Sequence, residues 1–255
     1  MSQDRVVFCM KWGTLYSADY VNVLYRATSQ NLTKPFRFVC LTDDPEGLLP
    51  GIETFPIPDL GLSPEHYLAG AWPKLGVFKR DLYDLTGRGL FIDLDMIITG
   101  SLEPFFDQPG DLITIGQHHW YPGQKQEEAN TCIFSFDIGK SSHLPEVFQA
   151  DIPKHVSSYL HEQEFVQGEY GAMSYWPKGW VISFKHHLRQ PLVLDRFKGP
   201  KRPGADVKIV AFHGRPRPID LINPPKGNWD RFPHYGRGQV DWAVEYWREH
   251  GGTVS

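Results

Sequence analysis

Long apolar runs are absent from this sequence of 255 residues. No segment has the roughly 20 consecutive apolar residues that a membrane-spanning helix needs. The N-terminal stretch MSQDRVVFCMKWG also lacks the basic segment followed by a long apolar segment that marks a secretory signal. We therefore expect a cytoplasmic protein with no transmembrane segment.

Cysteine and excess positive charge are scarce as well. The three cysteines, Cys9, Cys40 and Cys132, lie far apart inside apolar runs. This placement favours reduced, buried thiols over disulfides or a zinc site. The formal net charge is -4 and the pI is about 6.2, so no basic stripe is predicted and nucleic acid is not expected as a partner. An anionic ligand is expected to be small.

Hydrophobic residues make up 41% of the chain, enough for a large core and one globular unit over residues 1–255. Apolar runs that read as strands alternate with helical patterns, and neither an internal repeat nor a low-complexity linker interrupts them. This alternation predicts an α/β fold with a mostly parallel sheet flanked by helices. The expected strands are 6–10, 36–41, 53–57, 89–98, 111–117, 130–137, 180–186 and 207–212, and the expected helices include 72–85, a region around 144–160, and 240–250.

The stretch Gly89–Phe106, GLFIDLDMIITGSLEPFF, contains two carboxylates within an apolar run. Aspartate is disfavoured in strands and costly to bury without a partner. In one extended strand Asp93 and Asp95 would project to the same face, separated by about 6.6 Å of strand rise. They could then hold a divalent cation that also binds phosphate oxygens. The alternative is a pair of strand-end residues that caps turns or pairs with Arg88.

A second stretch, FHGRPRP at 212–218, combines a histidine, a glycine and two arginines in a turn stiffened by proline. Such a turn suits the binding of a diphosphate. His213 could alternatively be a strand-end histidine with no ligand role.

Four segments together resemble the retaining GT-A glycosyltransferases, especially the family 8 and glycogenin-like group and its bacterial relatives. The resemblance covers most of the chain and implies a single Rossmann-like GT-A domain with a mostly parallel mixed sheet. Its nucleotide-binding part would span about 1–107, and the part that binds the acceptor and completes the metal site about 108–255. FIDLDMII resembles the family's DxD motif, which implies that Asp93 and Asp95 bind Mn²⁺ and the diphosphate of a nucleotide sugar.

The other motifs carry further implied roles. WPKLGVF implies that Lys74 lies near the nucleotide phosphates, and ANTCIFSF that Asn130 faces the donor sugar. HEQEFV resembles the family's DQ segment, which implies that Glu162 and Gln163 lie at the catalytic edge of the pocket.

The turn at 212–218 resembles the motif in which a histidine completes the metal site and a later residue contacts the diphosphate. This likeness implies those roles for His213 and Arg217. The sequence departs from the family pattern in having Glu162 where Asp is usual, Arg217 where Lys is usual, and a shorter gap after the histidine.

Each of these residues could instead have a role that involves no ligand. Lys74 and Arg217 could be solvated charges, Glu162 and Gln163 ordinary helix-start residues, and Asn130 a turn residue. His118, His119 and Trp120 could stack on an acceptor sugar, although a loop with exposed aromatic residues more often has no such role. Trp12 and Tyr16 could contact the nucleotide base, although core packing is the stronger expectation.

The implied reaction moves a sugar from a nucleotide-diphosphate sugar, with a UDP-sugar as the favoured donor, to a glycan or other hydroxyl acceptor. Oxocarbenium character develops at the anomeric carbon while negative charge grows on the departing diphosphate. Mn²⁺, or Mg²⁺ in its place, would offset that charge. The resemblance implies retention of configuration, whereas inversion would require a general base, for which Glu162 or Glu164 could serve.

Two other functions are open from the sequence. A phosphatase of the haloacid dehalogenase type also carries DxD after an apolar strand, with Asp93 as its nucleophile; its usual Thr or Val two residues after the second aspartate is Ile97 here. A nucleotide-sugar-binding module without turnover is the non-enzymatic alternative. If the acceptor is lipid-linked, peripheral membrane association is expected.

Overall fold

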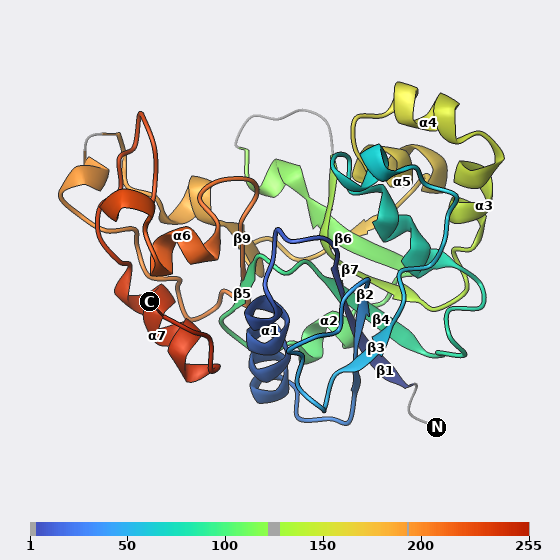
Figure 1. The fold of residues 1–255 in the computed structure, drawn as a ribbon, viewed down its shortest axis with the longest axis horizontal. Helices are drawn as coiled ribbons and strands as arrows, with labels where there is room; N and C mark the ends of the chain where they lie inside the picture. Colours follow the sequence, from blue (N-terminus) through green and yellow to red (C-terminus); the bar gives the residue numbers. More distant parts are fainter. Residues whose placement is uncertain (1–3, 122–127, 193, 255) are drawn as a thin grey trace.

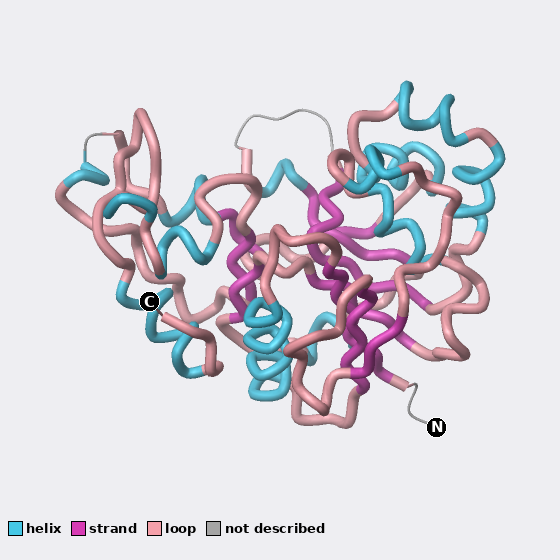
Figure 2. The backbone as a smooth tube through the Cα atoms, in the orientation of Figure 1, coloured by secondary structure: helices cyan, strands magenta, loops and turns pink. Residues whose placement is uncertain are grey.

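Two sheets organise the chain in the computed structural model, which describes residues 4–121, 128–192 and 194–254 (Figures 1 and 2). The main sheet has seven strands in the order β3-β2-β1-β4-β7-β6-β8. Four of its neighbouring pairs are parallel, and β7 runs antiparallel to both β4 and β6. Its strands are β1 (Arg5–Lys11), β2 (Arg37–Thr42), β3 (Glu53–Phe55), β4 (Arg88–Ile92), β6 (Leu112–Gly116), β7 (Ala129–Asp137) and β8 (Ser174–Tyr175).

The second sheet is small and follows directly from the main one. Its order is β5-β10-β9, with β5 (Met96–Ile98), β10 (Ile209–Ala211) and β9 (Val181–Ser183). Met96 pairs with Ala211, and Ala211 pairs with Ser183. The residues just before β5, just after β10 and just after β9 therefore share one edge of this sheet.

Both faces of the main sheet are covered, which explains the uninterrupted apolar runs of its strands. Side chains alternate along β1: Val7 and Cys9 belong to a core cluster with α1, whereas Val6, Phe8 and Met10 belong to a cluster with η2, α3 and α5. The helices are α1 (Ala18–Asn31), η2 (Trp72–Phe78), α2 (Glu103–Asp107), α3 (His143–Ala150), α4 (Ile152–Ser158), α5 (Glu162–Tyr170), α6 (Pro218–Ile222) and α7 (Asp241–Glu249), with shorter turns η1 (Pro64–Tyr67), η3 (Gln117–His119), η4 (Phe184–Leu188), η5 (Leu194–Arg196) and η6 (Pro225–Gly227).

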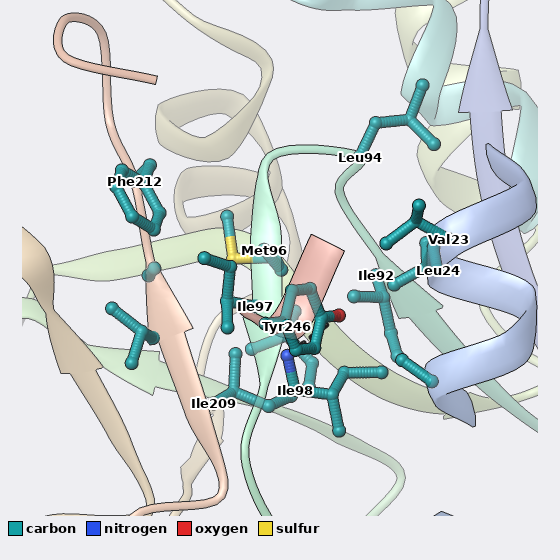
Figure 3. Close-up of a cluster of buried hydrophobic side chains, with 14 of the residues drawn as sticks. Val23, Leu24, Ile92, Leu94, Met96, Ile97, Ile98, Ile209, Phe212 and Tyr246 are labelled. Atoms are coloured by element: carbon teal, nitrogen blue, oxygen red, sulfur yellow. Dashed lines mark hydrogen bonds between the residues drawn. The ribbon is translucent and has the colours of Figure 1, made fainter. Parts of the chain in front are cut away.

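The two sheets share one core (Figure 3). Ile92 of β4 packs near Val23 and Leu24 of α1, and the side chains of β5 lie between these residues and β10. The backbone N–H of Ile98 donates to the hydroxyl of Tyr246 in α7 (3.3 Å). The C-terminal helix is thus fastened to the strand that follows the two aspartates.

The α/β prediction is confirmed, but three local expectations are wrong. The strand expected over 180–186 ends at Ser183, whose hydroxyl accepts the His186 backbone N–H at the start of η4. The strand expected through the aspartates ends at Ile92, and the chain turns at Asp93 to Asp95 before β5 joins the other sheet. Residues 72–85 form only the 3₁₀ turn η2, whose seven residues are all buried. Because η2 has no solvent-facing side, the apolar stripe that suggested a long amphipathic helix reflects burial all round.

The expectations for the cysteines are consistent with the structure: Cys9 and Cys40 are buried, Cys132 is half-buried, and all three are free thiols. Among the described helices, none is long and apolar enough to cross a bilayer.

Candidate active site

A cavity of about 630 Å³ opens where β1 and β4 end, at the carboxyl edge of the parallel strands. Ligands bind at this edge in open α/β sheets. One side is formed by residues after β1 and around η1, and the floor by Lys74, Asp93 and Asp95. Trp12 lines the first side, and its indole N–H donates to the carbonyl of Tyr67 (2.8 Å). The cavity has the size of a small-ligand site.

The aspartates occupy the turn that carries the chain from one sheet to the other. The backbone N–H of Asp93 continues the ladder to β7 by donating to the carbonyl of Cys132 (2.9 Å). Leu94, between the two, is buried in the core that Figure 3 shows. Asp93 and Asp95 are only half-buried and both line the cavity. The turn, rather than a shared strand face, presents both carboxylates to the cavity.

Lys74 is the buried cation of the site, with only 5% of its surface exposed. Its Nζ lies 3.0 and 3.1 Å from the two carboxylate oxygens of Asp93 and donates to the carbonyl of Thr131 (2.9 Å). Glu162 Oε1 is 3.8 Å from the same amine. Although burial disfavours its charged form, Asp93 and Glu162 outweigh that effect and raise the pKa of Lys74.

Glu162 stands behind Lys74 and is 3% exposed. Its carboxylate accepts a hydrogen bond from the Thr131 hydroxyl (2.5 Å), and its backbone N–H donates to the carbonyl of Gly70 (2.8 Å). Burial raises the pKa of Glu162 to about 6, although Lys74 and Thr131 act in the opposite direction. The first turn of α5 and the start of η2 therefore meet at this carboxylate.

Asp95 has a weaker set of partners. The hydroxyl of Tyr16 donates to it (3.0 Å), and the Tyr16 ring lies 5.7 Å from the guanidinium carbon of Arg217. Burial, followed by repulsion from Asp93, raises the pKa of Asp95 to about 7. Three carboxylates thus share one lysine, and this part of the cavity carries surplus negative charge.

This donor set fits a hard divalent cation as far as the two aspartates go. Carboxylate oxygens are the ligands that Mg²⁺ and Mn²⁺ favour, and a dication would neutralise the surplus charge. Within residues 4–121, 128–192 and 194–254, however, no three His, Cys, Asp or Glu side chains come together in a group that could hold a metal ion. A cation held by the two aspartates would take its other ligands from ligand oxygens and water.

His213 follows β10 at the sheet edge that β5 enters. Its Nε2 is hydrogen-bonded to the hydroxyl of Ser183 (2.7 Å), and its ring stacks against Trp120 and His186, each with centroids 5.6 Å away. Burial, and then the positive charges of Lys185 and His186, lower the pKa of His213 to about 4. The imidazole is therefore neutral near pH 7, as a metal ligand must be, but it does not lie in a group of three ligands with the aspartates.

No protein-family model and no curated protein matches this sequence. Its structure, in contrast, matches solved structures over nearly its whole length. A crystal structure of an active-site mutant of LgtC superposes with a TM-score of 0.59 and 13% identity, covering 98% of this chain and 96% of LgtC. The galactosyltransferase LgtC in complex with donor and acceptor sugar analogues gives a TM-score of 0.57, 14% identity and the same coverage.

The chain has the GT-A glycosyltransferase fold. The glycosyltransferase GlyE of Streptococcus pneumoniae TIGR4 gives a TM-score of 0.60 at 12% identity, with 97% of this chain matched to 60% of GlyE. Asp93, Asp95 and Lys74 therefore sit in the cavity of a GT-A fold.

Of the other residues considered for this site, Trp12 and Tyr16 line the cavity. Within the described part of the chain, the lining does not include Asn130, Glu162, Gln163, His213 or Arg217. The side-chain oxygen of Asn130 accepts a hydrogen bond from the backbone N–H of Cys132 (3.0 Å), and Gln163 is half-buried in the first turn of α5. Arg217 contacts Tyr16, and Glu162 contacts Lys74; in each case the contacted residue lines the cavity.

Two residues of the site, Thr131 and Tyr16, were not predicted in their observed roles. Thr131 is next to the predicted Asn130, and side chains alternate along a strand such as β7, so attention to strand phase could have suggested it. Tyr16 was considered only as a contact for the base. Nothing in the local sequence indicates that its hydroxyl bonds to Asp95, because the two residues are 79 positions apart.

The raised pKa values predict how stability of the GT-A domain depends on pH. The pKa of Asp95 is raised from 3.8 to about 7 and that of Glu162 from 4.5 to about 6. The folded state holds these protons more tightly than the unfolded chain, so their contribution is present at low pH and is lost as pH rises through about 6 to 7. In chelator, we expect these two carboxylates to lower the free energy of unfolding by about 1–3 kcal/mol between pH 5 and pH 8. The lowered pKa of His213 acts in the opposite direction over part of this range, so the carboxylate contribution is measured as a difference between the wild type and Asp95→Asn.

Denaturant unfolding of the wild type and of Asp95→Asn at both pH values checks this expectation. Between pH 5 and pH 8, the free energy of unfolding of Asp95→Asn should fall by less than that of the wild type. An equal pH dependence in the two proteins would contradict the assignment to Asp95.

Proposed function

We propose that this protein is a metal-dependent glycosyltransferase that moves a sugar from a nucleotide-diphosphate sugar to a hydroxyl acceptor. One observation carries the proposal. In a GT-A fold, the cavity at the carboxyl edge of the parallel strands holds two half-buried carboxylates whose charge the neighbouring cations do not balance. A nucleoside diphosphate with a divalent cation supplies the missing positive charge and fills such a cavity.

The cavity suggests how the donor is seated. Trp12 and the Tyr67–Leu68 segment give one side an aromatic and apolar character suited to a nucleobase. The diphosphate would then lie over Asp93 and Asp95, between the amine of Lys74 and the guanidinium of Arg217. A UDP-sugar is the favoured donor, and a glycan or another hydroxyl compound is the proposed acceptor.

The bond between the anomeric carbon and the diphosphate oxygen breaks as negative charge grows on the leaving group. Mn²⁺ or Mg²⁺ held by Asp93 and Asp95 would act there as a Lewis acid. Lys74 and Arg217 add positive charge near the leaving oxygen, and the buried amine is fixed before the reaction begins by Asp93 and Thr131. We propose transfer with retention, and NMR of the product's anomeric configuration tests it.

Glu162, Gln163 and Asn130 complete the proposed donor side. Since Glu162 is buried behind Lys74, we assign it the role of holding that amine in place rather than contacting the sugar. Gln163, the next residue on α5, and Asn130 on β7 keep the donor-sugar role that the resemblance implies, which requires the bound sugar to extend beyond the residues that line the cavity. This arrangement gives Glu162 no direct path to an acceptor, and so favours retention over general-base inversion.

A thermal-shift experiment with UDP, GDP and p-nitrophenyl phosphate, each with Mn²⁺ or chelator, tests the proposal. UDP with Mn²⁺ should raise the Tm, and chelator should abolish the shift, because ligand binding to the folded state stabilises it. Slow hydrolysis of a UDP-sugar would then distinguish an enzyme from a binding module. Turnover of p-nitrophenyl phosphate that is lost in Asp93→Asn would favour the phosphatase alternative instead.

Ser183 offers a test of whether His213 completes the metal site. Its hydroxyl competes for Nε2 of His213, so Ser183→Ala should leave the affinity for Mn²⁺ unchanged or higher if the imidazole binds the metal. His213→Ala should lower that affinity about 10–100-fold. Mn²⁺ titration followed by electron paramagnetic resonance measures both. Equal affinity in His213→Ala and the wild type would leave the aspartates as the protein's only ligands among these three residues.

A further inference from the structure

Exposed apolar side chains occur on two neighbouring loops, residues 189–192 with 194–206 and residues 224–239, which we call the first and second loops. Among the described residues, eight large hydrophobic side chains are exposed, and four of them belong to these loops. They are Leu192 (55% exposed), Leu194 (38%), Phe197 (81%) and Phe232 (78%). Single exposed apolar residues are common, but a group of this kind marks an interaction surface.

The two loops are joined to each other at their bases. Asp195 of the first loop is 2% exposed, and its carboxylate lies 2.5 Å from Nδ1 of His234 in the second loop. Arg189 forms an ion pair with Asp230 across the same junction. The segments that carry the exposed phenylalanines are therefore neighbours in space, at the end of the molecule opposite α3 and α4 (orange in Figure 1).

The first loop is closed rather than loose. Asp195 accepts a hydrogen bond from the backbone N–H of Gln190 (2.8 Å), and the Gln190 side chain donates to the carbonyl of Gly199 (3.0 Å). The backbone N–H of Lys201 donates to the carbonyl of Leu188 (2.7 Å). These bonds join described residues at the two ends of the loop, and Leu192, Leu194 and Phe197 remain exposed, with no part in the core.

Contacts within the protein also hold the base of the second loop. Trp229, 2% exposed, packs on Phe184 and donates its backbone N–H to the carbonyl of Gly236 (2.8 Å). A side chain at Gly236 would collide with the Trp229 ring, since a Cβ there would lie 1.9 Å from it. The buried tryptophan thus anchors the loop while Phe232 remains in solvent.

The charge of the loops is opposite to that of the whole chain. They contain eight Lys and Arg residues but three Asp and Glu residues, a net charge of +5, whereas the chain carries -4. Lys198, Lys201, Arg231 and Arg237 are exposed and form no ion pair within the part of the chain that the structure describes. Exposed aromatic and aliphatic side chains on the same loops as unpaired cations match the surface of an anionic bilayer.

We propose that the two loops form a membrane-binding surface that docks on anionic lipid. Phe197, Phe232 and the leucines would enter the interface between headgroups and acyl chains, and the Lys and Arg residues would contact the headgroup phosphates. The first loop begins directly after η4, where Lys185 Nζ donates to the carbonyl of His213 (2.5 Å). Docking would therefore place η4, and the His213 segment bonded to it, close to the membrane.

Vesicle sedimentation of the full chain tests the proposal without nucleotide or sugar, so its outcome is independent of the proposed enzymatic function. The probes are phosphatidylcholine vesicles alone and the same vesicles with about one-third phosphatidylglycerol, a composition chosen to give a negative surface potential. We expect binding to the anionic vesicles and at least about tenfold weaker binding to the neutral ones.

Two variants and one matched control locate the surface. The double variant Phe197→Ser/Phe232→Ser should bind anionic vesicles about 100-fold more weakly, because two aromatic side chains no longer enter the interface. Lys198→Gln/Arg231→Gln should lose about tenfold or more and become less sensitive to salt. Leu160→Ser, which removes another exposed side chain (76%) near α5, should bind like the wild type.

All replaced residues are exposed, so an unchanged Tm should accompany each variant and exclude misfolding as the cause. Absence of binding to anionic vesicles at low salt would overturn the proposal, as would equal binding by the double phenylalanine variant. Analytical ultracentrifugation completes the test. A dimer that forms without lipid and is lost in that variant would assign the surface to a second copy of the chain instead.

Discussion

Replacing Asp95 by Asn is expected to reduce the proposed glycosyl transfer by at least about 10³-fold, since it removes one of the two carboxylates proposed to hold the cation that would stabilise leaving-group charge. The asparagine has the same shape and can still accept the hydrogen bond from Tyr16. What disappears is one negative charge that a divalent cation requires. The Tm increase produced by UDP with Mn²⁺ should disappear together with activity.

The stability of Asp95→Asn should not fall together with its activity. Without metal, Asp95 is repelled by Asp93 and disfavoured by burial, so Asp95→Asn should be at least as stable as the wild type at pH 8 in chelator. Asp93→Asn should lose activity to a similar extent but should also lose stability, because Lys74 loses its closest counter-charge. Kinetics and denaturant unfolding of both variants separate these effects.

Asp206→Asn is the matched control, because this carboxylate is exposed in the loop before β10 and should leave activity and stability unchanged. An active Asp95→Asn protein that still responds to Mn²⁺ and UDP would contradict the proposed metal site.

Much of the fold could be predicted because the strands are buried on both faces. Val6 to Met10 is apolar at every position, and its residues divide between the two core clusters. Burial on all sides also explains the wrong prediction around η2. Because all seven of its residues are buried, its apolar side chains match the pattern expected for one face of a longer helix. Apolar periodicity reports burial, and distinguishes helix from strand only where one side of the element faces water.

The candidate site was predictable only in part, for a reason that the strand at Asp93 illustrates. Two carboxylates in an apolar run predicted a ligand site at a strand end, and both line a cavity there, but the chain turns at Asp93 to change sheets. Pairing between β5 and β10 then decides what lies near Asp95. Such long-range pairing leaves no local signal, so neither the Tyr16–Asp95 hydrogen bond nor the Ser183–His213 hydrogen bond could be read from the sequence.

Lys74→Met is expected to be the most destabilising single substitution in the site. Methionine fills a similar volume, but it leaves Glu162 buried and Asp93 half-buried without the amine that now lies 3.8 Å and 3.0 Å from them. Removing one partner of a buried ion pair costs about 3–5 kcal/mol, because the remaining charge stays desolvated. The pKa values of Asp93 and Glu162, already raised by burial, should rise further, so the loss should be larger at pH 8 than at pH 5.

Lys11→Met is the matched control for this prediction. Lys11 is also buried, at 4% exposed, but its carboxylate partner Asp44 has a side chain that is 58% exposed and can be solvated by water when the lysine is removed. This variant should therefore lose less stability, at most about 1–2 kcal/mol. Adding Glu162→Gln to Lys74→Met should recover part of the loss, because the double variant no longer buries an unpaired glutamate. Denaturant unfolding of the wild type, the two lysine variants and the double variant at pH 5 and pH 8 tests this prediction. Equal losses of stability in the two lysine variants would mean that Lys74 stabilises the fold by packing rather than by balancing the carboxylates of the site.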